Sequence, residues 1–186
     1  MFSPAGAVMP TPMVFSCFGS LFGAWTSAYA EGATAAASQT GIAANQAIYV
    51  PVVLTTGATW TRGWWWNGSV PGNAGNIAVG IYDEAGNRLA TTGAVAASGA
   101  SVVQSAAFSA SVFLYPGAYY VGYSPSASGV NATWGFSSSS SVQRGRYAGA
   151  YTQAVGSHPL PATATFATWS SQVVPMFGIA RTSFAI

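Results

Sequence analysis

Short runs in which apolar residues alternate with others recur along the chain after residue 47. In the clearest run, residues 76–82, isoleucine or valine occupies every second position, which on a strand places all three on one face. Residues 83–87 follow with two of the chain's three acids, a glycine and an asparagine, residue types that favour a turn. Residues 88–92 complete the pattern of a β-hairpin with the acids at its exposed tip.

Similar runs predict further strands, separated by Gly, Pro, Asn and Ser at intervals of about ten residues. Pro51 lies inside the first run and indicates an edge strand or a strand entry, because proline cannot donate to a ladder. The predicted strands cover residues 48–54, 59–66, 76–82, 88–92, 101–108, 119–123, 133–136 and 173–180. This spacing predicts an all-β fold, an antiparallel jelly-roll-like sandwich of about eight strands.

The first 44 residues differ from the rest. Residues 1–25 are apolar without helical or alternating periodicity, and residues 31–39 have the composition for one or two helical turns. Such an apolar segment is unlike a disordered tail, so we expect an extended N-terminal docking arm over 1–44 that lies on another protein, followed by one sandwich domain over 45–186. The apolar residues expected to dock are Met1, Phe2, Pro4, Met9, Pro10, Pro12, Met13, Phe15, Phe18, Phe22 and Trp25.

Charge is nearly absent. Charged residues make up 4% of the 186 residues, against about a quarter in an ordinary soluble domain. Such a surface has little electrostatic defence against self-association, so we expect copies of the chain or other partners to cover much of it. The net charge of +2 is spread over scattered arginines, which argues against nucleic-acid binding. No apolar run reaches the length of about 18 residues that a membrane helix needs, so no membrane insertion is expected.

Five runs, which begin at Ala47, Gly80, Leu114, Leu160 and Val174, resemble β-sandwich proteins of tailed-bacteriophage virions, of the tail-fibre, minor-tail and head-decoration types. The shared motifs are structural: the hairpin turn, a Pro-Gly turn and proline-containing edge strands. The resemblance implies a virion protein made in the cytoplasm of a bacterial host. For such a particle protein, the depletion of charge and the apolar arm lead us to expect a homotrimer that contacts other virion proteins, either a tail adaptor or the major capsid protein.

Catalysis is not expected from this composition. The chain has a single histidine, His158, a single cysteine, Cys17, and no Gly-x-Ser-x-Gly motif. The three acids, Glu31, Asp83 and Glu84, offer few pairs for general acid-base chemistry. We therefore predict no enzyme activity, no catalytic residue, no metal site and no cofactor.

Aromatic residues are abundant, with seven Trp and nine Tyr. Flat aromatic faces in a charge-poor sandwich suit glycan recognition, but most aromatic side chains serve packing in a core or between subunits. Strand alternation directs Trp65 away from its two tryptophan neighbours, so at least one indole faces away from the core unless another subunit covers it. The candidates for glycan or partner contact are Trp64, Trp65, Trp66, Tyr119, Tyr120 and Tyr123.

Three functions remain open from the sequence. The first is a trimeric tail fibre or spike component that takes part in host adsorption and contacts a host surface glycan. The second is a capsid decoration or cement protein that stabilises the head. The third is a carbohydrate-binding module.

Overall fold

The computed structural model describes residues 42–67, 75–100, 102–127, 151–153, 156–168 and 177–181, together with the backbone of four further short strands. These parts contain β-strands and no helix, and all their strand pairs are antiparallel. The predicted all-β antiparallel sandwich is therefore confirmed.

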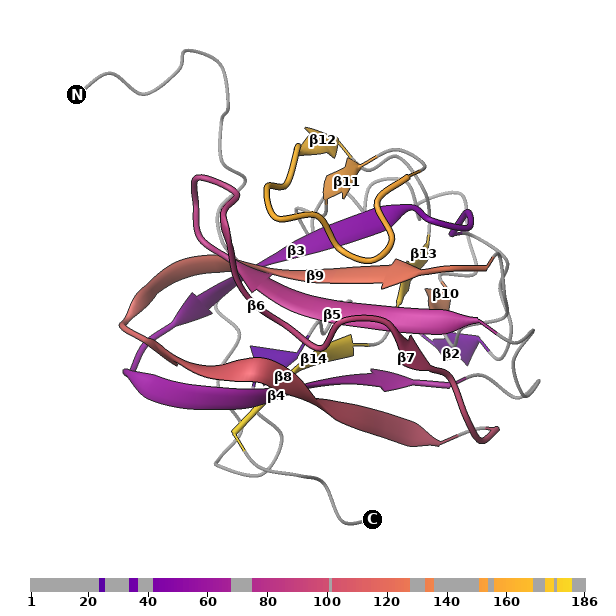
Figure 1. Ribbon diagram of the computed structural model, residues 1–186, viewed down its shortest axis with the longest axis horizontal. Helices are drawn as coiled ribbons and strands as arrows, with labels where there is room; N and C mark the ends of the chain where they lie inside the picture. Colours follow the sequence, from indigo (N-terminus) through magenta and orange to yellow (C-terminus); the bar gives the residue numbers. More distant parts are fainter. Residues whose placement is uncertain are drawn as a thin grey trace.

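Two larger sheets face each other, and Figure 1 shows the four-stranded sheet below the seven-stranded one. The four-stranded sheet has the order β1 (Ala24–Trp25), β14 (Phe177–Ala180), β4 (Ala58–Trp66) and β8 (Val103–Leu114). The seven-stranded sheet has the order β12 (Ala167–Thr168), β11 (Tyr151–Gln153), β3 (Ala47–Leu54), β9 (Gly117–Pro125), β5 (Asn76–Tyr82) and β6 (Arg88–Thr91), with β7 (Val95–Ala96) also paired to β5. A three-stranded sheet has the order β13 (Val173–Pro175), β10 (Thr133–Gly135) and β2 (Thr34–Ala36).

The main core lies between the two larger sheets. The alternation seen in the sequence produces it, because alternate residues of each strand point inward. Its buried members include Trp60, Trp65, Phe177 and Ile179 from the four-stranded sheet and Ile48, Val50, Ile77, Val79, Ile81, Val121 and Tyr123 from the seven-stranded sheet. The predicted hairpin over 76–92 is confirmed, with β5 and β6 joined by the turn at 83–87.

The outer face of the seven-stranded sheet is covered as well. Residues 156–166, which we call the cover loop, place Leu160, Ala164 and Phe166 over Tyr49, Tyr82 and Tyr120 in a second apolar cluster. The cover loop is tied to the start of β6 through backbone hydrogen bonds from Arg88 to Ala162 and from Ala164 to Gly86. Burial in this cluster raises the pKa of Tyr49 to about 12.

The strand predicted over 173–180 is wrong as a single element. The structure divides it into β13 and β14, which belong to different sheets. β13 ends at Pro175, which has no N–H to donate to a further strand, and β14 begins at Phe177. The local role expected for Pro51 agrees with the structure, because among the described residues β11 pairs with β3 only at residues 47–49, and no described strand lies on that side of residue 51.

Part of the expected arm forms strands with the same chain. Trp25 of β1 lies opposite Gly178, and β2 pairs with β10. The helical turn expected over 31–39 is wrong at 34–36, where pairing with β10 overrides a weak helical propensity. The other docking candidates of the arm lie outside the described residues.

Candidate functional site

Asp83 and His158 have structural partners. The Asp83 carboxylate accepts hydrogen bonds from the backbone N–H of Asn87 at 2.8 Å and from its side-chain amide at 2.9 Å, which fixes the hairpin turn. No cluster of three or more potential metal-binding side chains occurs among the described residues. Cys17 and Glu31 lie outside that part of the chain.

His158 fastens the cover loop to β9. Its Nδ1 lies 3.0 Å from the carbonyl oxygen of Ser124, and the hydroxyl of Ser124 donates to the carbonyl of Ser157 at 2.9 Å. A carbonyl only accepts, so Nδ1 carries the proton and Nε2 is the unprotonated nitrogen. Nε2 is buried without a hydrogen-bond partner among the described residues, and burial lowers the pKa of His158. The neutral imidazole therefore has a structural role, since its hydrogen bond joins the cover loop to β9.

The three consecutive tryptophans lie in different surroundings. Trp65 is fully buried in the main core, where its Nε1 donates to Asn67 at 3.1 Å. Trp64 and Trp66 point to the opposite face of the sheet, as the alternation predicted. Trp64 is only 5% exposed and Trp66 is half-buried, so Trp66 has the most accessible indole of the three.

The three candidate tyrosines are also largely packed. Tyr123 lies in the main core with its ring 5.1 Å from that of Phe177. Tyr120 lies under the cover loop, 4.3 Å from the ring of Phe166. Tyr119 is half-buried, and its hydroxyl donates to the carbonyl of Tyr115 at 3.1 Å.

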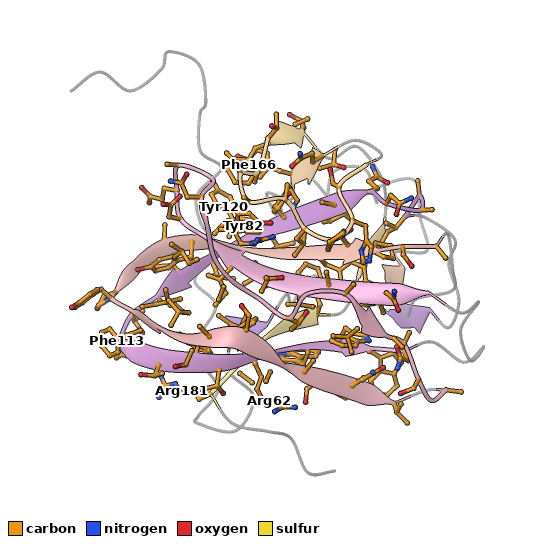
Figure 2. All side chains as sticks on the ribbon, in the orientation of Figure 1. Arg62, Tyr82, Phe113, Tyr120, Phe166 and Arg181 are labelled. Atoms are coloured by element: carbon orange, nitrogen blue, oxygen red, sulfur yellow. The ribbon has the colours of Figure 1, made fainter. Side chains whose placement is uncertain are left out.

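An aromatic pair that sequence reasoning missed lies at the tip of the β8–β9 hairpin. Phe113 is 52% exposed and Tyr115 is 72% exposed, and their rings meet edge to face at 5.0 Å. Figure 2 shows Phe113 at one end of the molecule, away from Tyr82, Tyr120 and Phe166. The signal was available, since two aromatics directly before a Pro-Gly turn reach the end of a sandwich, where no opposing sheet covers them.

The exposed large apolar side chains lie on or beside two edge strands. Among the described residues, the large exposed hydrophobics are Leu89, Val102, Phe113 and Tyr115. Leu89 belongs to β6, and the other three lie on β8 or directly beside its ends. Strands β6 and β8 are edge strands of the two sheets and run close to each other (Figure 1). These two neighbouring edges are the candidate functional surface, because unpaired strand edges with exposed apolar side chains beside them favour contact with another chain.

Comparisons with known proteins give no relatives: no protein-family model, no curated protein and no solved structure matches this chain. In the part of the chain that the structure describes, no helix has the length and apolar character to cross a membrane.

Proposed function

We propose that this chain is a non-enzymatic structural protein of a tailed-bacteriophage virion that works as a homo-oligomer, with a trimer as the expected state. Its leading assignment is a tail fibre or spike component in host adsorption, attached to the tail adaptor by the N-terminal arm. Capsid decoration is the alternative position on the particle, with the arm on the major capsid protein. The virion assignment rests on the sequence resemblance.

One observation carries the structural role. In a sandwich with 4% charged residues, the exposed large apolar side chains among those described lie on or beside the edge strands β6 and β8. In a free monomer these apolar side chains would promote aggregation, whereas in a subunit of a particle they are buried against neighbouring subunits. Asp83 fixes the hairpin turn and His158 fastens the cover loop, which fits a structural role for these two side chains.

The copy number per virion tests the proposal. Quantitative mass spectrometry of purified particles, referred to the major capsid protein, should give about ten to forty copies for closed oligomers around a tail. Hundreds of copies would assign the protein to the capsid surface as a decoration protein. Its absence from particles would refute the virion role.

The aromatic tip favours glycan binding as a second function. Phe113 and Tyr115 present exposed rings without a charged residue between positions 113 and 117, and neutral sugars pack on such rings. Glycan-array binding that is lost in Tyr115→Ala and kept in Trp66→Ala would support this function. Equal binding by the two variants would place any sugar site elsewhere.

A further inference from the structure

Strand β8 is the one long free edge in the described part of the fold. The other outer strands, β1, β12, β13 and β2, have two or three residues each. The edge at β6 has four residues, carries a bulge at Leu89 and is bridged by the cover loop, where Asn87 pairs with Thr163. β8 has twelve residues with neither a charge nor a proline. Long edges without such protection are templates for pairing with another strand.

The pairing register shows which backbone groups of β8 remain free. The N–H of Asn67 donates to the carbonyl of Val102 at 2.8 Å, and residues 62–66 pair with 107–103 in the same register. Antiparallel ladders alternate between hydrogen-bonded and non-hydrogen-bonded pairs, so residues 102, 104 and 106 bond to β4. The N–H and C=O groups of Val103, Ser105 and Ala107 therefore point away from β4. No backbone hydrogen bond joins them to another described segment.

This free edge is complementary to itself. A two-fold axis at Ser105 places Ser105 opposite its own copy and Val103 opposite Ala107 of the second copy. Each of the three residue pairs then exchanges two N–H···O=C bonds, which gives six hydrogen bonds across the edge. The side chains that would meet beside the axis are Val, Ser and Ala, which are small enough for close approach. Beyond residue 107 the edge changes, because the register with β4 shifts between Trp60 and Arg62 and the extra residues lie at 108–111.

We propose that the edge Val103–Ala107 of β8 binds the same edge of a second copy of this chain. The two four-stranded sheets then continue into one eight-stranded sheet. This edge would be a surface through which copies of the chain contact each other, and the biological role of that contact rests on the proposed function. If three copies form a trimer through other surfaces, that trimer has three free β8 edges. Two-fold pairing at these edges would then link one trimer to the next.

A second copy is the occupant that the chemistry favours. Only an extended backbone satisfies alternating N–H and C=O groups along an edge, which points to a strand. Because this edge has no charge of its own, two copies meet without like-charge repulsion between edge side chains. The nearest charge is Arg62, whose guanidinium donates to the Ser105 carbonyl and hydroxyl at 3.3 Å each. These long contacts leave one lone pair of that carbonyl for a partner strand.

The test compares the full-length protein with edge variants by analytical ultracentrifugation over a concentration series. Ala107→Lys places a charge on the edge, and Ala107→Pro removes an outward N–H without removing a bond to β4. We expect both to weaken association at least tenfold. Ala85→Lys, at the exposed hairpin tip, is the matched control and should associate as the wild type does. Circular dichroism and thermal melting confirm that each variant is folded.

Register-specific crosslinking gives a second readout. In a Cys17→Ser background, Ser105→Cys should form an intermolecular disulfide on mild oxidation, because hydrogen-bonded antiparallel pairs have Cα atoms about 5.5 Å apart. Ser111→Cys should not. The inference is overturned if folded edge variants associate like the wild type, or if the protein keeps one mass at all concentrations and Ser105→Cys does not crosslink. Pairing by a protein that is absent from virions would refute the proposed function and leave the edge contact standing.

Discussion

The two sheets lie close together at Gly63, and adding one methyl group there tests the packing argument. A Cβ at this position would lie 2.6 Å from Cβ and 2.7 Å from Cγ1 of Val79, and 2.9 Å from Cγ2 of Thr92. Carbon atoms pack at about 3.5–4.0 Å, so β4 and β5 would have to separate by about 1 Å. Both strands are paired on two sides and Val79 is fully buried, so moving either strand would disturb its hydrogen bonds or the packing around Val79.

Gly63→Ala should therefore destabilise the fold by about 3 kcal/mol, the upper end of the cost of overpacking. Urea unfolding followed by tryptophan fluorescence measures this, since Trp60 and Trp65 lie in the same core. Gly117→Ala is the matched control, because its Cβ would meet nothing closer than 3.7 Å, and it should change stability by less than about 0.5 kcal/mol. A Gly63→Ala protein within 0.5 kcal/mol of the wild type would refute the claim that Gly63 sets the spacing between the sheets.

Three side chains give further predictions. The Tyr123 hydroxyl is buried without a hydrogen-bond partner among the described residues, so Tyr123→Phe should stabilise the protein by about 1 kcal/mol in urea unfolding. The Tyr82 hydroxyl donates to the Pro161 carbonyl at 2.8 Å, so Tyr82→Phe leaves that carbonyl without its donor and should destabilise the protein by about 1–2 kcal/mol. Opposite signs for the two variants are the decisive result. Burial lowers the pKa of His158 below its ordinary 6.5, so the unfolded chain takes up this proton first and stability should be complete above pH 6.5 and fall as the pH drops below it. The chain has no other histidine, so His158→Gln should remove the slope between pH 5 and 6.5, and a slope that persists would contradict this assignment.

The main core could be predicted from the sequence because it depends on local alternation. The inward positions of β5 and of β9, and the turn between β5 and β6, follow from residue spacing and turn chemistry alone. The second apolar cluster could not, because the side chains that cover Tyr82 come from residues about 80 positions later in a segment without periodicity. The same limit applies to the aromatic candidates: alternation separates Trp65 from its neighbours, but it does not say that Tyr120 lies beneath Phe166.

The candidate surface was only partly predictable for a related reason. A low charge content indicates a surface that meets copies or partners, but it does not indicate which side. That assignment needs the strand order, which makes β8 an edge and leaves Phe113 and Tyr115 without an opposing sheet.

The position of β14 determines when the sandwich can close during synthesis. The central strand β4 pairs with β8 on one side and with β14 on the other, and β14 brings Phe177 and Ile179 into the main core. Residues 66 and 177 are separated by about 110 residues, and at about 5–20 residues per second the ribosome needs about 6–22 s to make them. For that time a growing chain with few charges carries a tryptophan-rich strand with one side unpaired. We expect the yield of folded protein in a cell to depend on chaperones that hold nascent chains.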